Sequence, residues 1–207
     1  MGSMKGFIIG VGAILIVQKW LTSVQDERKN NDVSDRVTVY QIGDQITLGK
    51  YTATCQKLTD KGVIFMLDQY LDKAYKMNAE WTNKGGYEAS DLRKNLQADF
   101  AKDENFDSIR DILVPFENGD LVRIPTVGEF FGEDDWCVMD DAEQWALMKD
   151  RKNRIANREG EYEWGWLQNT VKESATRFAG VLLSGLATNH YASASAGVRP
   201  VFMLEQK

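Results

Sequence analysis

The stretch Gly197–Leu204, "GVRPVFML", decides how this chain is read. Pro200 can open a strand, because a missing backbone N–H is tolerated at a strand's first residue. The apolar run that follows it, Val201–Leu204, is typical of a buried strand. Arg199 stands directly beside that strand, and a guanidinium can hold several carbonyls, or one carboxylate, with its fixed fork of five donors. We assign Arg199 the role of a structural clamp, with contact to a ligand as the alternative.

The first half of the chain shows the two-residue period of strands. Apolar and polar residues alternate over Val37–Val39, Ile46–Leu48 and Tyr51–Cys55, with turn signals between these segments. A continuous apolar run, "GVIFMLD" (Gly62–Asp68), then predicts a buried central strand. The pattern indicates an antiparallel meander.

Helical signals occupy the middle of the chain. Ser90 is a good N-cap, and Leu92, Leu96 and Phe100 fall on one face of the helix that follows it. Three further helices are predicted: one from Phe106 that stops before Pro115, one with a Thr126–Glu129 capping box and Gly132 as its stop, and a longer one over Asp140–Asn157 with Trp145, Met148 and Ile155 inward.

The tail returns to strands. We expect strand structure around Trp164 and Trp166 and over Val181–Leu183, a polar loop over Ala187–Gly197, and the closing strand after Arg199. The whole pattern predicts a single α+β domain over residues 36–207, with antiparallel sheets, two to four helices, and both chain-terminal strands in one sheet.

The composition limits the possible functions. The formal net charge of −6 argues against a nucleic-acid partner. The chain has one histidine, His190, so a multi-histidine metal site is excluded. Its two cysteines, Cys55 and Cys137, form no CxxC motif, and they are either two buried thiols or one disulfide bridge.

The first 35 residues differ in character from the rest. Met1–Ser3 reads as an expression scar. Phe7–Val17 is an unbroken run of apolar residues and glycine, shorter than the ~20 residues that a membrane span needs. It is a short membrane anchor, a segment docked on the domain or on a partner, or a weak secretion signal. Residues 7–24 could thus contact a membrane or a second copy of the chain, and a charged linker, Gln25–Arg36, follows.

Five motifs stand in an order that resembles an uncharacterised family of bacterial and phage domains with a C-type-lectin-like fold. The motifs are "IGDQITLGKY" (Ile42–Tyr51), a spaced series (Trp81, Ser90, Leu92, Arg93, Leu96 and Phe100), "IPTVGEFFG" (Ile124–Gly132), "WGWLQN" (Trp164–Asn169) and "GVRPVF" (Gly197–Phe202). The resemblance covers residues 37–204 and extends distantly to formylglycine-generating enzymes and phage tropism proteins. It implies structural roles for Arg199, Trp81 and Arg93. The chain departs from the family's Leu-Arg-Ser at Gln168 and Asn169, and in an insert around Asp140–Asn157.

The residues favour binding over catalysis. Neither cysteine has a second cysteine near it in sequence for oxidase chemistry, and no Gly-x-Ser-x-Gly elbow accompanies His190 for a hydrolase. The candidate ligand contacts are aromatic and small polar residues near the end of the chain: Trp164, Trp166, Asn169, Asn189, His190, Tyr191, Ser193 and Ser195. A cluster of acids could hold Ca²⁺, although a solvated acidic loop is the simpler interpretation: Glu133, Asp134, Asp135, Asp140 and Asp141.

We therefore expect a non-enzymatic recognition module that binds a protein or glycan and lies on a phage virion or a bacterial cell surface. The alternative is a structural subunit that serves assembly of a particle or membrane complex and binds no ligand. We expect no cofactor, with Ca²⁺ at the acidic cluster as the alternative.

Overall fold

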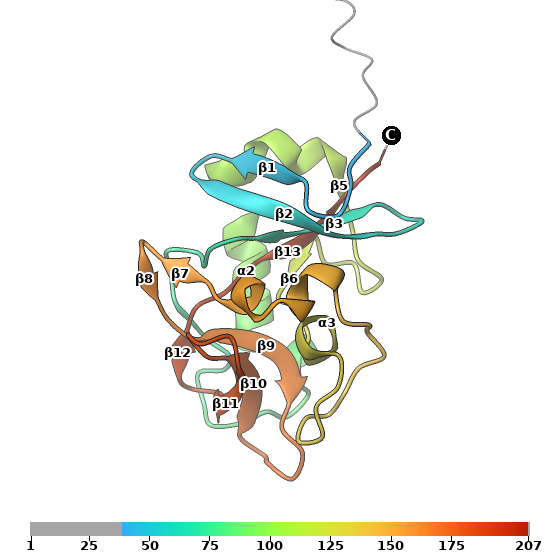
Figure 1. The fold of residues 1–207 in the computed structure, drawn as a ribbon. Coiled ribbons are helices and arrows are strands. Elements are labelled where there is room, and N and C mark those ends of the chain that lie inside the picture. Colours follow the sequence, from blue (N-terminus) through green and yellow to red (C-terminus); the bar gives the residue numbers. More distant parts are fainter. Residues whose placement is uncertain (1–38, 207) are drawn as a thin grey trace, which may run out of the picture. The chain divides into compact units, whose positions relative to one another are not determined.

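The closing strand predicted from the sequence, β13 (Val201–Leu204), lies inside a six-stranded sheet in the computed structural model, which describes residues 39–206 (Figure 1). All four of its residues are buried. One neighbour is β3 (Val63–Leu67), also buried throughout, which pairs antiparallel with β13 from Val201–Met66 to Leu204–Val63. The central strand predicted over Gly62–Asp68 is thus confirmed.

The large sheet has the order β1-β2-β3-β13-β5, and β6 also pairs with β13. Its strands pair antiparallel throughout the described residues. Its remaining strands are β1 (Gln45–Leu48), β2 (Tyr51–Leu58), β5 (Leu113–Val114) and β6 (Val122–Arg123). The first and last described strands therefore share one sheet, as the sequence predicted.

A second antiparallel sheet has three strands in the order β11-β10-β9. These strands are β9 (Gly165–Thr170), β10 (Arg177–Val181) and β11 (Ala187–Tyr191). Two further pairs complete the β structure: β4 (Tyr75–Lys76) with β12 (Ser195–Ala196), and β7 (Asn157–Arg158) with β8 (Glu161–Tyr162).

The helices are short, and most are of the 3-10 type. Among residues 39–206, the α-helices are α2 (Asp91–Phe100) and α3 (Val127–Phe131), and the 3-10 helices are η1 (Tyr87–Ala89), η2 (Glu104–Ile112), η3 (Ala146–Lys149) and η4 (Arg151–Arg154). The Ser90 cap on α2 and the Thr126–Glu129 capping box on α3 are both present. The α+β class is confirmed, with β structure predominating.

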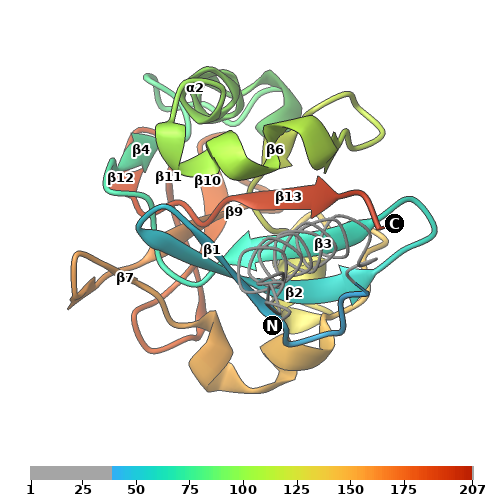
Figure 2. The ribbon, with the colours of Figure 1, turned by 90° about the horizontal axis from the view of Figure 1, so that it is seen from above.

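The large sheet carries a hydrophobic core on each face, because successive side chains of a strand point to opposite sides. Phe65 and Phe202 belong to the core that also contains the buried face of α2, whereas Met66 and Val201 belong to the core that also contains Phe130 of α3. Figure 2 shows α2 on one side of β13 and the helices of the segment 146–154 (orange) on the other. The three-stranded sheet contributes to both cores, with Trp166 in the first and Leu167 in the second.

Two helix predictions need correction. The segment Asp140–Asn157 is not one long helix, since only η3 and η4 form there. Asp150 separates them with an extended backbone, and its side chain accepts a hydrogen bond from the Lys152 N–H, which starts η4 anew. The helix expected from Phe106 is the 3-10 helix η2, and the chain enters β5 at Leu113, before Pro115.

Three strand and loop predictions also need correction. Val39 is exposed and lies outside any strand, because the first strand of the described chain begins at Gln45. The strand placed over Val181–Leu183 ends at Val181, where a tight turn with Gly185 at a φ of 77° leads into β11. The segment Ala187–Gly197 is not a loop, since β11 and β12 occupy most of it.

The predictions for Met1–Ser3, for the apolar run 7–17 with its extension to residue 24, and for the linker 25–36 concern residues outside the described part of the chain. Residues 39–206 form one compact unit. Within that unit, no helix has the length and apolarity needed to cross a bilayer.

Candidate functional site

The candidate residues on β11 point to opposite faces of the three-stranded sheet. Asn189 and Tyr191 are two positions apart and share one face, whereas His190 lies between them on the other. Tyr191 is opposite Arg177 in the pairing of β10 with β11, and His190 is opposite Phe178. The loop site expected from the sequence is therefore divided by a strand.

An exposed aromatic cluster lies on the Tyr191 side, and we call it the aromatic platform: Trp81, Arg177, Asn189 and Tyr191. The rings of Trp81 and Tyr191 stack with centroids 5.0 Å apart and an angle of 11° between their planes. Trp81 is 66% exposed and Tyr191 is 41% exposed. The Arg177 guanidinium lies 4.4 Å from the centre of the Tyr191 ring and donates to Asn189 Oδ1 at 2.7 Å.

Hydrogen bonds hold the loop that carries Trp81 against the three-stranded sheet. The Asn83 N–H donates to Ala175 O at 2.9 Å, and its side-chain amide donates to Ser174 O and Arg177 O at 2.7 and 3.1 Å. A buried asparagine, Asn78, also donates to Thr82 O. These bonds fix Thr82 and Asn83, which directly follow Trp81, and so hold its loop in place beside the sheet.

Trp81, for which the resemblance implies a structural role, does not pack in the core, because its ring is mostly exposed and contacts Tyr191 at the surface. Its loop, between β4 and η1, is anchored through Asn78 and Asn83 and leaves the indole outside the core. The indole and phenol rings offer flat apolar faces, with a cation and an amide beside them. Such groups recognise sugar rings or planar and cationic side chains by stacking and hydrogen bonding.

Trp164 and His190 pack together on the opposite face. Their rings stack with centroids 3.8 Å apart, and Trp164 meets Trp166 edge-on at 4.8 Å. Burial, and to a lesser degree the charge of Arg177, lowers the pKa of His190. His190 Nε2 is buried and has no hydrogen-bond partner within residues 39–206. The arrangement makes His190 a neutral packing residue at pH 7.

Trp166 and Asn169 belong to the scaffold. Trp166 is buried and donates from Nε1 to Tyr75 O at 2.8 Å. Asn169 accepts from the Val127 N–H at 2.7 Å and donates to Val138 O and Asp140 Oδ2 at 3.0 and 2.8 Å. A ligand at the surface cannot reach either residue without disrupting these bonds, so we remove both from the binding set.

The two candidate serines lie after β11. Ser193 is half-buried in the turn in which the Ala194 N–H donates to Tyr191 O. Ser195 is exposed and opens β12 opposite Lys76. Both are near the platform in sequence, and neither has a side-chain hydrogen bond to it among the described contacts.

Arg199 and Arg93 hold backbone and carboxylate groups together. Arg199 is 5% exposed and donates from Nε to Leu67 O at 2.8 Å and from Nη1 to Asn153 O at 2.9 Å. It thus joins the end of β3 to η4. Arg93 makes a two-pronged pair with Asp120 at 2.6 and 2.8 Å and also donates to Glu88 O.

The acidic candidates do not converge in the described structure. Asp140 is engaged with the Ala142 N–H and with Asn169, and Asp134 accepts from the Trp136 N–H. Over residues 39–206, no group of three or more histidine, cysteine, aspartate or glutamate side chains is placed to hold a metal ion.

Cys55 and Cys137 are free, buried thiols in the described structure. They lie in different cores, one on each side of the large sheet. Burial is the main cause that raises the pKa of Cys55 to about 11 and that of Cys137 to about 12. Of the two alternatives left by the sequence, two buried thiols is the one observed.

Comparison of the chain with protein-family models, with curated proteins and with solved structures finds no match. The case for a binding site therefore rests on the geometry of the aromatic platform. Sequence reasoning missed Arg177 altogether, because the Ala187–Gly197 segment was interpreted as a loop and so offered no cross-strand partner for β10. Once β11 is recognised, the pairing of Arg177 with Tyr191 follows from the register.

Proposed function

We propose that this domain is a non-enzymatic recognition module that binds a glycan or protein ligand through the aromatic platform, on a phage particle or a bacterial surface. The exposed stack of Trp81 on Tyr191 carries the proposal. Burying large aromatic rings is favourable, and soluble domains rarely leave two of them stacked together at the surface without use. Aromatic anchors of this kind dominate the free energy of many interfaces.

A C-type-lectin-like fold is the fold we propose for the domain. The support is an antiparallel sheet that contains both the first and the last strand, a smaller second sheet, and α2 packed on one face of the large sheet. The sequence resemblance, from Ile42–Tyr51 to Gly197–Phe202, points in the same direction.

The test is binding of the full chain to a glycan array and to whole bacterial cells, with the variants Trp81→Ala and Tyr191→Ala. True anchor residues contribute about 2 kcal/mol or more, which corresponds to roughly thirtyfold weaker binding for each variant. Tyr162→Ala is the matched control, because Tyr162 is an exposed aromatic on β8 that is not part of the platform. Thermal melting of each variant checks that the fold is retained.

Each result has a defined meaning. Binding that survives both platform substitutions, or that is lost equally in Tyr162→Ala, refutes the site. Self-association that the two platform substitutions abolish, with no binding to any cell or glycan, refutes the recognition function and favours an assembly subunit. Repeating the array with EDTA tests the acidic loop, and an unchanged signal there rules calcium out of the interaction.

A further inference from the structure

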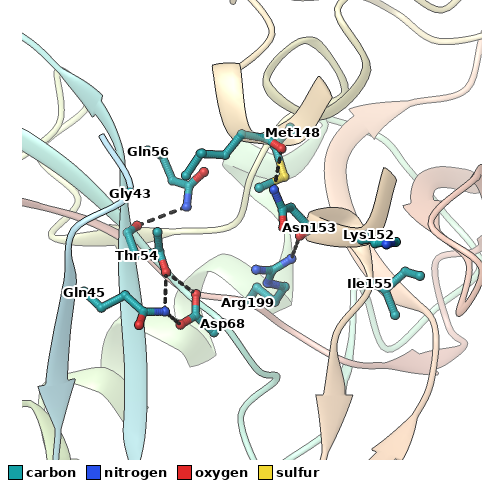
Figure 3. A pocket seen from close by; sticks show the side chains of 11 residues that line it. Gly43, Gln45, Thr54, Gln56, Asp68, Met148, Lys152, Asn153, Ile155 and Arg199 are labelled. Atoms are coloured by element: carbon teal, nitrogen blue, oxygen red, sulfur yellow. Dashed lines mark hydrogen bonds between the residues drawn. The ribbon is translucent and has the colours of Figure 1, made fainter. Parts of the chain in front are cut away.

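A polar pocket of about 450 Å³ lies away from the aromatic platform, on the face of the large sheet that η3 and η4 cover. It shares no residue with the platform. One wall is formed by polar side chains of the β1–β3 region: Gln45, Thr54, Gln56 and Asp68. The facing wall is formed by the η3–η4 segment and Arg199: Leu147, Met148, Lys152, Asn153, Ile155 and Arg199 (Figure 3). Lys152 is exposed to solvent, whereas Arg199 is buried.

Arg199 contributes a buried positive charge to this pocket. Its Nε and Nη1 groups donate to backbone carbonyls, while its Nη2 group has no hydrogen bond within the described residues. It forms no ion pair with any carboxylate of residues 39–206. Burial lowers the pKa of Arg199, and Tyr70 and Asp68 only oppose that effect. An unpaired buried charge is costly, so an anionic group at Nη2 would be strongly favoured.

Asp68 supplies a negative charge to the opposite wall. Its carboxylate accepts from Thr54 Oγ1 at 2.6 Å and from Gln45 Nε2 at 3.1 Å, and further lone pairs are left over. Burial raises the pKa of Asp68, although these hydrogen bonds and the charge of Arg199 act against the rise. Asp68 and Arg199 line the same pocket and yet form no ion pair with each other. A molecule that carries a negative and a positive group could therefore bind Arg199 with the first and Asp68 with the second.

Gln56 adds an unused acceptor at the same wall. The residue is only 2% exposed, and its amide donates to Thr54 O at 3.1 Å. Its Oε1 atom is buried and receives no hydrogen bond within residues 39–206. A buried acceptor without a donor costs about 1–3 kcal/mol. Because the terminal torsion of a glutamine is broad, the carboxamide can turn to meet an N–H donor that enters the pocket.

We propose that this pocket binds a free α-amino acid with an apolar side chain. The carboxylate of the amino acid binds Arg199 Nη2, and its ammonium group donates to Asp68 and to Gln56 Oε1. Its side chain packs against Leu147, Met148 and Ile155 on the facing wall. An uncharged sugar could donate a hydrogen bond to Gln56 Oε1 but would leave the charge of Arg199 unpaired. A simple anion would pair with Arg199 but would leave Gln56 Oε1 without a donor. A zwitterion satisfies both walls at once.

The test is isothermal titration calorimetry of the full chain with L-leucine, L-methionine and glycine, each at up to about 10 mM, a range that detects Kd values near 1 mM. We expect heat of binding for leucine and methionine and weaker binding for glycine. N-acetyl-leucine and leucinamide, which lack the ammonium and the carboxylate respectively, should each bind at least tenfold more weakly. No binding heat for any amino acid, or binding of either blocked form as tight as that of leucine, overturns the proposal.

Two variants locate the site. Asp68→Asn keeps the shape of a half-buried side chain, removes its charge, and should weaken leucine binding at least tenfold. Asp111→Asn, at an exposed carboxylate outside the pocket, is the matched control and should bind as the parent chain does. Thermal melting without ligand shows whether Asp68→Asn is folded, and Gln56→Met provides a second, uncharged probe of the same wall. Leucine binding that both pocket variants retain, or equal binding of glucose, refutes the assignment.

Discussion

Replacing Arg199 with lysine tests whether the planar guanidinium holds β3 and η4 together. Arg199 uses two donors at once, with Nε 2.8 Å from Leu67 O and Nη1 2.9 Å from Asn153 O. A lysine carries one compact ammonium at the end of a flexible stem, so it cannot occupy both donor positions. At least one buried carbonyl therefore loses a charged donor, and the guanidinium 5.9 Å from the centre of the Phe130 ring is lost as well.

The expected loss can be worked out from these contacts. A hydrogen bond to a charged group contributes about 1.5–3 kcal/mol, and we expect Arg199→Lys to lower the free energy of unfolding by about 2–3 kcal/mol. For a domain of this size, each kcal/mol shifts the melting temperature by about 2–4 °C, so the shift is about 4–12 °C.

Differential scanning calorimetry and urea unfolding measure this loss. Arg151→Lys is the control, at an exposed arginine whose side chain makes no hydrogen bond within residues 39–206. If Arg199→Lys melts within 1–2 °C of the parent chain, the clamp does not stabilise the fold and the reasoning fails.

Three further predictions follow from the buried polar groups. Cys55 and Cys137 should resist alkylation at pH 8 in the folded chain and react quickly in urea, and fast labelling of the folded chain would contradict their burial. Because folding raises their pKa values to about 11 and about 12, the free energy of unfolding should fall as the pH rises through 9 towards 11. Folding lowers the pKa of His190, so the contribution of its neutral form to stability is complete above about pH 6.5 and is lost as the pH falls below that value. His190→Gln should therefore reduce the drop in melting temperature between about pH 7.5 and pH 5, and an unchanged drop would contradict this role of His190. Asn169→Ala removes three buried hydrogen bonds and should cost about 2–4 kcal/mol in urea unfolding, whereas a loss below 1 kcal/mol would show that the bonds around Asp140 are replaced.

The parts of the fold that were predicted correctly are those set by neighbours in sequence. Ser90 caps α2 through the Arg93 N–H three residues on, and Thr126 with Glu129 forms the capping box of α3 within one turn. The apolar runs that became β3 and β13 are buried on both faces, so their composition identifies them without knowledge of their partners. Such signals are local, and single-sequence reasoning can detect them.

The parts that were missed depend on partners far away in the chain. Segment Ala187–Tyr191 consists mainly of small and polar residues, and it becomes a strand because β10 supplies its backbone partners. Trp81 matches a motif that implied a structural role, but its exposure is decided by a loop that Asn83 fastens to the three-stranded sheet. The pocket could not be predicted either, because its lining brings together Asp68, Gln56 and Arg199 from distant parts of the chain. No sequence spacing reports that juxtaposition.

The exposed area of the platform also sets how tightly one ligand can bind, if the proposed function is correct. Large aromatic side chains present about 150–250 Å² each, so the 66% exposure of Trp81 and the 41% exposure of Tyr191 leave roughly 200 Å² available in total. At about 25 cal/mol per Å², covering that area contributes at most about 5 kcal/mol, from which the cost of association must be subtracted. We therefore predict that a single soluble oligosaccharide binds with a Kd near 1 mM, and that dense display raises the apparent affinity by about 10²-fold or more. Titration of one oligosaccharide by NMR, beside an array of graded glycan density with an immobilised, multivalent form of the chain, measures both values. A nanomolar Kd for the monovalent ligand would show that the platform is only part of a larger binding surface.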